Sequence, residues 1–507
     1  MTDPTANIDP QWVIDTNTAN IVNGLAPYDP VTATLAWFDT LRAIEECINL
    51  PMADWDDDEF EARLYNLALP PLLWDPSPLL ALRPRLVTKF SETFANRFQN
   101  LMMQSAAISA ALAQHGLFEP AQGFLSVRTM IGYLQSRRRH FVALLHTLPS
   151  ACCGRQRVDP LDTLNIFVPL IEMQALQIVG AQQALLIEAA RAQLGLPDAP
   201  DSELAMLDDY FLEPERARIT EMPLTKAALA ILATREPQPS DRLFSAAELR
   251  NDIIAAEAAY GEFDLAATEF GPAAVFIRRV SREFVERDFW VAIKPKELER
   301  LLNTLELSAR LRAALVRPSA DYATNLDSYA PFVLVDGIYR STVSLLSRFI
   351  YYWRSRCLDR SKRYQIRTGF IFEKAVADAL ERQGFEVQKI TRIDRHEFDV
   401  VTLRDGMIWN VQCKNNMTDL EWVEGDPKRF ARYNRNLVLA YERALAKERD
   451  REGVLTAHLG NKAVEHMLVS RFPVVTDNSR IVAFSRIDGF ATRANAILAK
   501  RKQDTVN

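Results

Sequence analysis

Apolar and polar positions in the last third of the chain alternate with the two-residue period of β-strands. The runs 397–403 and 407–414 are rich in β-branched and aromatic residues and are separated by a short turn containing Asp405-Gly406. Asp-Gly between two such runs is a strong signal for a β-hairpin. The pattern therefore predicts two antiparallel strands joined by this turn.

The turn also predicts a register. With Asp405 and Gly406 as the two loop residues, Asp399 lies directly opposite Gln412. Opposed side chains have Cβ atoms roughly 5 Å apart, so both oxygens can reach one divalent cation. Lys414 lies on the same face. The other face is expected to be apolar core, with Phe398, Val400, Trp409, Val411 and the Cys413 thiol.

The segments around the hairpin show helical and extended periods. Before it, apolar residues recur at helical spacing around Glu373, and Gly384 is placed to end that helix in a left-handed conformation. The predicted elements after the hairpin are a helix over 427–447, strands over 467–475 and 480–485, and a closing helix over 489–500.

This order of elements, with Gln412-Cys413-Lys414 on the second hairpin strand, resembles the PD-(D/E)XK nuclease superfamily over roughly residues 364–490. The Gln-x-Lys form is similar to its Mrr-like restriction endonuclease branch. The resemblance implies a C-terminal α/β restriction-endonuclease-like domain, with a mixed central sheet flanked by helices. It also implies Mg²⁺-dependent hydrolysis of phosphodiester bonds in DNA, with Mn²⁺ as a substitute, and a role in restricting foreign DNA as antiviral defence.

Each candidate residue has an expected role. Asp399 is a hard oxygen ligand for Mg²⁺, and Gln412 offers a neutral carbonyl oxygen where relatives with Glu-x-Lys have a carboxylate. Lys414 is suited to orienting the attacking water or stabilising charge on the phosphate. The resemblance adds the backbone carbonyl of Cys413 as a further ligand and Glu373 as a residue that holds the metal through water.

Two neighbouring residues are secondary candidates. Glu397 lies opposite Lys414 in the predicted register, so an ion pair between them is expected, and His396 either reaches the phosphate or is a local structural residue. A Gln-x-Lys pattern by itself is usual on a solvated strand face. The alternative hypothesis is therefore a catalytically inactive nuclease fold that binds nucleic acid or regulates, and a third is RNA processing.

Charge is distributed unevenly along the chain. Residues 361–507 contain 26 Lys and Arg against 20 Asp and Glu, a net charge of +6, whereas residues 1–360 carry −12. A basic module with a metal site suits a polyanionic substrate, because neutralising phosphates provides much of nucleic-acid affinity. The same asymmetry is compatible with intramolecular docking of the acidic N-terminal region on the basic C-terminal domain.

Residues 1–330 are rich in Ala, Leu and Glu and predict a mostly helical region of unknown role, with one or two subdomains. Long helices are expected over 86–112 and 161–194, and a leucine stripe indicates another over 297–316. The acidic cluster 54–61 is typical of a helix start, where carboxylates favour the positive end of the dipole.

Two basic segments are interpreted as structural. Residues 331–363 are expected to form a basic, aromatic connecting helix before the nuclease-like domain at 364–507, and its Arg and Tyr content allows a nucleic-acid contact as the alternative. The run 136–140 receives the same interpretation.

Localisation is expected to be cytoplasmic. The first ten residues lack a signal-peptide pattern, and no uncharged apolar run is long enough to span a bilayer, so no membrane partner is expected. Five dispersed cysteines without zinc spacing fit a reducing compartment. The sequence leaves homo-oligomerisation open.

Overall fold

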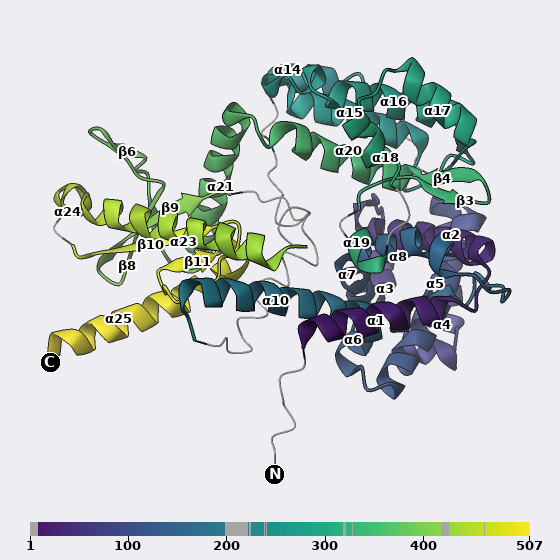
Figure 1. Ribbon diagram of the computed structural model, residues 1–507, viewed down its shortest axis with the longest axis horizontal. Helices are drawn as coiled ribbons and strands as arrows, with labels where there is room; N and C mark the ends of the chain where they lie inside the picture. Colours follow the sequence, from purple (N-terminus) through teal and green to yellow (C-terminus); the bar gives the residue numbers. More distant parts are fainter. Residues whose placement is uncertain are drawn as a thin grey trace, which may run out of the picture. The chain divides into compact units, whose positions relative to one another are not determined.

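The computed structural model describes residues 9–197, 222, 225–237, 239, 241–317, 321–326, 328–416, 425–460 and 462–506. The chain divides into two compact units, each discontinuous in sequence. The N-terminal unit comprises Met1–Val179 and Pro223–Leu358, and the C-terminal unit comprises Gly180–Met222 and Asp359–Asn507. The described residues are mostly helical in the first unit and form a mixed sheet with flanking helices in the second (Figure 1).

The N-terminal unit is built from helices that bury their apolar faces against one another. Its first half contains α1 Pro10–Leu25, α2 Pro30–Ile48, α3 Asp58–Tyr65, α4 Ser77–Lys89, α5 Glu92–Gln114, α6 Phe118–Gln122, α7 Val127–Ser136, α8 Arg138–Ala151 and α9 Thr163–Leu170. Its second half contains α14 Lys226–Leu232, α15 Ala246–Ala259, α16 Phe270–Glu283, α17 Pro295–Thr304, α18 Ala309–Leu315, α19 Tyr322–Asn325 and α20 Val343–Leu358.

Several predicted helices are shorter than expected. The segment 86–112 is divided between α4 and α5, because the Ser91 side chain caps a new helix by accepting a hydrogen bond from Phe94 N at 3.1 Å. The segment 297–316 is likewise divided between α17 and α18, and Ser308 caps the second helix. Such caps satisfy amide groups at a helix start, so a new helix begins there.

Other helical predictions are confirmed. The acidic cluster is a helix start, with Asp57 as the N-cap of α3 and an acidic first turn. Residues 163–194 are continuously helical: α9 continues through the π-helical turn Ile171–Ala175 into α10 Leu176–Leu194.

A four-stranded sheet in the N-terminal unit was not predicted. The antiparallel strands β1 Val285–Glu286, β2 Trp290–Ile293, β4 Ile338–Thr342 and β3 Val333–Val335 pair in that order. Residues 331–363 are therefore no single connecting helix, because β3 and β4 precede α20 and the unit boundary follows Leu358.

The basic segments of the N-terminal unit are largely occupied by tertiary contacts. In the run 136–140, Arg137 pairs with Glu172 at 2.7 Å and Arg138 pairs with Glu45 at 2.7 Å. In α20, Phe349 and Trp353 are buried. Its arginines lie over tyrosine rings rather than on a freely solvated face: Arg348 over Tyr329, Arg354 over Tyr260 and Tyr351, and Arg356 over Tyr352.

One described helical segment, Thr163–Leu194, is long and apolar enough to cross a membrane by length and composition. Leu164 and Phe167 in this segment are fully buried. Glu172 is also buried and accepts a hydrogen bond from the Tyr133 hydroxyl at 2.6 Å. Core helices of soluble proteins meet the same test, so the segment is not identified as a membrane helix.

The C-terminal unit contains a five-stranded mixed sheet. Its strand order is β11 Ile481–Ala483, β10 Val464–Ser470, β9 Met407–Lys414, β8 Val400–Arg404 and β5 Glu386–Gln388. Strand β10 is parallel to β9 and β11, whereas β8 is antiparallel to β9 and β5. The helices are α21 Lys362–Arg382, α23 Pro427–Arg449, α24 Glu452–Leu459 and α25 Phe490–Val506.

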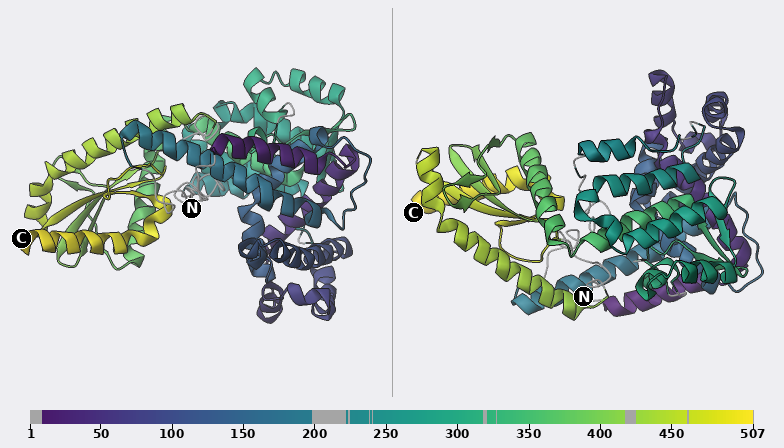
Figure 2. Two further views of the ribbon diagram at one scale, coloured as in Figure 1. Left: turned by 60° about the horizontal axis from the view of Figure 1, so that its bottom comes forward. Right: turned by 90° about the horizontal axis from the view of Figure 1, so that it is seen from above.

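Helices cover both faces of this sheet (Figure 2). On one face, Trp409 and Val411 of β9 pack in a cluster with Phe372 of α21 and Phe490 of α25. On the other face, Leu468 of β10 packs with residues of α23. The expected helix–hairpin–helix–strand–strand–helix order is present, with the unpredicted additions of β5, of the ribbon formed by β6 Arg392–Ile393 and β7 His396–Glu397, and of α24.

The predicted hairpin register is confirmed from Val400 to the turn, whereas the predicted Asp399–Gln412 pair lies outside the ladder. Val401 pairs with Asn410, Leu403 with Ile408 and Arg404 with Met407, and both Asp405 and Gly406 have positive φ, at 53° and 75°. Turns with positive φ at both central residues match the twist of antiparallel strands. Gly384 has φ of 82° after α21, as predicted.

The second half of α10 belongs to the C-terminal unit. Leu186 and Ile187 are fully buried in the cluster that contains Leu468 and Phe472. A helix that precedes the nuclease-like segment by more than one hundred residues therefore completes its core, which the sequence pattern did not predict.

Candidate functional site

The candidate site lies at the end of β9, where its partner β8 has not yet begun. The ladder between the two strands starts at Val400 and Val411. Asp399 precedes the ladder, and its Oδ2 accepts a hydrogen bond from the Cys413 backbone N–H at 2.7 Å. Because one residue in a strand directs its N–H and C=O to the same side, the Cys413 carbonyl also faces the Asp399 side.

Gln412 and Lys414 extend the site along β9. The Gln412 Oε1 atom is buried without a hydrogen-bond donor in the described part of the chain. A buried carbonyl oxygen without a partner is costly, and a small cation would satisfy it. The described residues give the Lys414 ammonium no hydrogen-bond or ion-pair partner, while its backbone carbonyl accepts from Arg471 N at 2.9 Å.

These oxygen donors fit a hard divalent cation. Asp399, the Gln412 amide and the Cys413 carbonyl would hold it, with Glu373 reaching it through water, and carboxylate and carbonyl oxygens are the ligands that Mg²⁺ and Mn²⁺ prefer. Among the described residues there is no group of three or more His, Cys, Asp and Glu that could hold a metal. The candidate set of metal ligands therefore depends on the neutral Gln412 amide, and the total negative charge of these ligands is low.

Glu373 lies on α21 close to the other charged groups. Burial, then repulsion by Asp399, raises the pKa of Glu373 to about 7, while Lys414 acts in the opposite direction. Burial also raises the pKa of Asp399, which the Cys413 N–H and Lys414 oppose. The structure thus brings Glu373, Asp399 and Lys414 within electrostatic range of one another, as the sequence predicted.

The polar face of the hairpin is not open to solvent along its length. Helix α23 covers it, and Asn410 is buried, donating to Glu448 Oε2 at 2.9 Å and lying 3.2 Å from His466 Nδ1. Glu448 also contributes repulsion that raises the pKa of Asp399. The expectation of one core face and one chemical face is therefore wrong: both faces carry core, and only the strand end carries the site.

Glu448 was missed by sequence reasoning. It continues the buried stripe of α23 formed by Tyr441 and Leu445. An acidic residue at the helical spacing of buried apolar residues is the sequence signal that could have revealed it. Arg451 Nη1 binds its Oε1 at 3.1 Å, so this acid is paired and its nearest role is to support Asn410.

The two secondary candidates lie outside the central strands. His396 and Glu397 form β7 in the ribbon with β6 (Figure 1). Glu397 approaches Arg392 at 3.6 Å and is largely exposed, so the expected ion pair with Lys414 is wrong. The ribbon redirects this acid, although Glu397 still contributes to the raised pKa of Glu373 and Asp399. No contact of His396 with Asp399, Glu373 or Lys414 is present in the described structure.

The Cys413 thiol is half-buried against the cluster of Trp409 and Val411, as expected. Burial, with repulsion by Asp399 and Glu373, holds its pKa well above the ordinary thiol value. The thiolate is the reactive form, so this side chain is not suited to nucleophilic chemistry.

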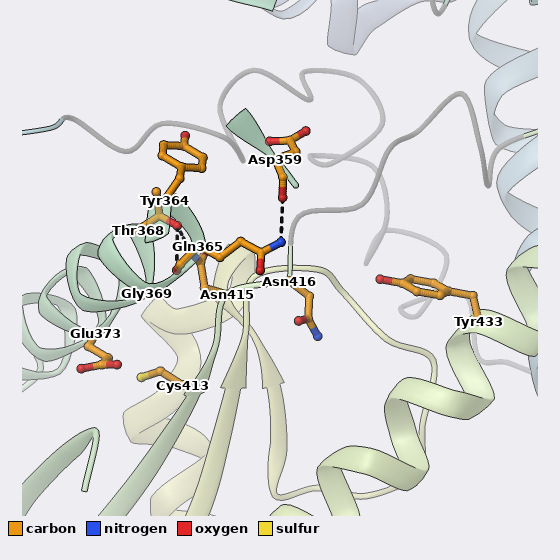
Figure 3. Close-up of a pocket in the computed structure, with 10 residues that line it drawn as sticks. All are labelled: Asp359, Tyr364, Gln365, Thr368, Gly369, Glu373, Cys413, Asn415, Asn416 and Tyr433. Carbon is orange, nitrogen blue, oxygen red and sulfur yellow. Dashed lines mark hydrogen bonds between the residues drawn. The ribbon is translucent and has the colours of Figure 1, made fainter. Parts of the chain in front are cut away.

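A cavity of about 340 Å³ adjoins the site (Figure 3). Glu373 and Cys413 both line its wall. The cavity is therefore directly adjacent to the candidate metal ligands. Its other lining residues come from the segment before α21, from α21, from the segment after β9 and from α23: Asp359, Tyr364, Gln365, Thr368, Gly369, Asn415, Asn416 and Tyr433.

Comparison with known proteins identifies no relative of this chain. No protein-family model, no curated protein and no solved structure matches it. The case for a function therefore depends on the geometry of the site.

The raised pKa of Glu373 predicts a pH-dependent stability effect. The folded state binds a proton here up to about pH 7, whereas the unfolded chain releases it near pH 4.5. Stability therefore falls as pH rises through that window. We expect Glu373→Gln in metal-free buffer to raise the free energy of unfolding by about 1–2 kcal/mol at pH 8, after allowance for solvent screening of a half-exposed group, and to change it little at pH 4.

Chemical denaturation at both pH values checks this expectation. Glu381→Gln, on an exposed position of the same helix, is the matched control and should change stability little at either pH. Equal effects of Glu373→Gln at pH 4 and pH 8 would contradict the assigned repulsion.

Proposed function

We propose that the C-terminal unit is a metal-dependent endonuclease of the PD-(D/E)XK type, similar to the Mrr-like branch, that hydrolyses phosphodiester bonds in DNA and acts in restriction of foreign DNA. The observation that carries the proposal is that Asp399, Lys414 and Glu373 lie within electrostatic range of one another at the end of β9, the strand that also carries the unpartnered Gln412 oxygen. Packing of Trp409 and Val411 against α21 holds the strand and the helix that carry these groups in position.

The roles follow from the chemistry of each group. Asp399 is held through Oδ2 by the Cys413 N–H, and no described residue donates a hydrogen bond to its other oxygen. A divalent cation, when bound, supplies positive charge against the phosphate and lowers the pKa of water. Lys414, whose ammonium is not engaged by the described residues, is positioned to bind a phosphate oxygen and to stabilise charge that develops on it.

Glu373 is suited to managing a proton. With a pKa raised to about 7, its carboxyl is near the point where it can both accept and release a proton at neutral pH. It is therefore the residue of this site best able to orient a water molecule and take up its proton. Loss of that carboxyl should alter the pH profile of cleavage.

A second candidate function is a nucleic-acid-binding or regulatory module without catalysis. The observation that favours it is the neutral Gln412, which leaves only two carboxylates, Asp399 and Glu373, among the expected ligands. A site with less negative charge binds Mg²⁺ more weakly. The net charge of +6 over residues 361–507 fits a polyanionic partner in either case.

Plasmid DNA incubated with purified full-length protein separates the two functions. Cleavage in Mg²⁺ or Mn²⁺ that EDTA prevents supports the endonuclease. Binding of DNA without cleavage in either metal supports the regulatory module. A parallel assay with structured RNA in competition tests whether RNA is the preferred substrate.

Gln412→Glu sharpens this test. The added carboxylate should strengthen metal binding, so we expect the Mg²⁺ concentration for half-maximal cleavage to fall by about tenfold. Gln388→Glu on the edge strand β5 adds the same charge away from the site and should leave that concentration unchanged. A metal requirement unaffected by Gln412→Glu would contradict a cation at this amide.

A further inference from the structure

Each of the amides that line the cavity beside the candidate site has one N–H engaged by a neighbouring group. Gln365 Nε2 donates to the backbone carbonyl of Asp359 at 2.7 Å (Figure 3). A carbonyl only accepts, so this contact fixes the amide orientation. The Gln365 Oε1 atom is left without a donor in the described structure and available to a ligand.

A relay fixes Asn416 in the same way. The Ser470 hydroxyl donates to Phe472 O at 2.7 Å, and therefore accepts from the Tyr441 hydroxyl at 2.8 Å. The Tyr441 oxygen in turn accepts from Asn416 Nδ2 at 2.7 Å. The relay ends at a carbonyl, which can only accept. The donor and the acceptor of each hydrogen bond in the relay are therefore determined. Asn416 is thereby left to present its Oδ1 atom.

Asn415 follows the same pattern. Its Nδ2 donates to Thr368 Oγ1 at 3.0 Å, and the Thr368 hydroxyl donates to the Gln365 backbone carbonyl at 3.1 Å. Gln365 and Asn416 therefore contribute amide oxygens to the cavity wall, and the Glu373 carboxyl adds another acceptor, whereas the Asn415 oxygen is itself buried. A wall of this kind selects a ligand that carries hydrogen-bond donors.

The other walls suit a flat ring. Tyr364 and Tyr433 line the cavity from different helices (Figure 3), and aromatic side chains are the usual platforms for nucleobases. Gly369 leaves open space, because a Cβ at this position would meet nothing within 4 Å. A cavity of about 340 Å³ admits a single unstacked nucleotide, whereas a duplex is far too large to enter.

We propose that this cavity captures one unpaired nucleobase that bears an exocyclic amino group, next to the phosphate that the candidate site would hydrolyse. The inference rests on the proposed function for its nucleic-acid partner and extends it to a substrate class: strands with an accessible unpaired adenine, cytosine or guanine. Thymine and uracil lack the amino group and present a carbonyl to the same acceptors, which repel it.

The test compares short single-stranded homopolymers of deoxycytidine and deoxyuridine, whose bases differ in an amino group against a carbonyl at C4 and in an unprotonated N3 against an N3–H. Affinity is measured by fluorescence anisotropy in Ca²⁺ with full-length protein. We expect the deoxycytidine strand to bind about tenfold more tightly, the effect of a specific base contact. Equal affinities would overturn the proposal.

Gly369→Leu fills the cavity from α21 and leaves the candidate catalytic residues unchanged in identity. We expect it to remove the preference for deoxycytidine. Gly453→Leu is the matched control, since Gly453 is also helical with open space at its Cβ but lies on α24, and it should preserve the preference. A preference that survives Gly369→Leu would overturn the assignment to this cavity.

Two further measurements separate the alternatives. Binding of a dilysine peptide that disappears in Gly369→Leu would assign the cavity to a cationic ligand and overturn the nucleobase. Plasmid cleavage in Mg²⁺ by the same preparations keeps the two proposals apart: cleavage without base preference contradicts only the cavity assignment, and base preference without cleavage contradicts only the catalytic function.

Discussion

Asp399→Ala and Lys414→Ala should each reduce metal-dependent cleavage by at least about 10²–10³-fold, the loss seen when one charge-stabilising group is removed from an active site. Asp399 is the carboxylate ligand that the Cys413 N–H holds in place. Lys414 is the cation that no described residue engages and that is proposed to meet the phosphate. The measurement is single-turnover cleavage of plasmid DNA at saturating Mg²⁺.

The two variants should fail in different ways. Loss of Asp399 removes a metal ligand, so excess Mn²⁺ is expected to restore part of the rate. Loss of Lys414 removes charge stabilisation, so metal concentration should not restore it. Cleavage at the wild-type rate in either variant would contradict the site.

A control on the same unit tests whether charge changes alone affect cleavage. Asp378 forms an exposed ion pair with Lys374 on α21 at 2.7 Å. Asp378→Asn should leave the rate unchanged, because exposed pairs of this kind contribute little. Retained secondary structure in the circular dichroism of Asp399→Ala and Lys414→Ala would show that the loss is chemical.

Leu186→Asp should unfold the C-terminal unit although residue 186 lies far from it in sequence. The side chain is fully buried with Leu468 and Phe472. Replacing it loses apolar burial and places an unpaired charge in the core, at a cost of about 3–5 kcal/mol. Hydrogen exchange measured on peptides from β9 and β10 should accelerate, and cleavage should fall with it.

Gln193→Asp is the matched control for this substitution. Gln193 is exposed on the same helix, so the added charge should change stability by no more than about 0.5 kcal/mol. Slow exchange in β9 and β10 of the Leu186→Asp protein would show that α10 is dispensable for this core. A fragment that begins at residue 359 would lack the helix and is expected to be unstable.

Local patterns carried most of the information about the hairpin. The Asp405-Gly406 turn and the two-residue period were enough to predict the register from the Val400–Val411 pair to the turn, because turn type and side-chain alternation are set by neighbouring residues. The Gly384 cap and the extent of α23 followed from equally local signals.

The N-terminal sheet was missed for a related reason. Strands β1 to β4 have two to five residues each, and β2 and β4 are separated by α17, α18 and α19. Strands this short give no measurable period, and their pairing is decided by contacts between distant segments.

The chain by itself therefore determined a hairpin, its register and the residues that the hairpin aligns, because these depend on steric preferences within a few residues. Only the tertiary structure decided that helix α23 covers the polar face and that Glu397 turns toward Arg392. It also decided that α10 completes the core and that Gln365 and Asn416 line one cavity with Glu373. These outcomes depend on which elements far apart in the sequence pack against each other and exclude water from their contact. A pattern within a few neighbouring residues does not determine this packing.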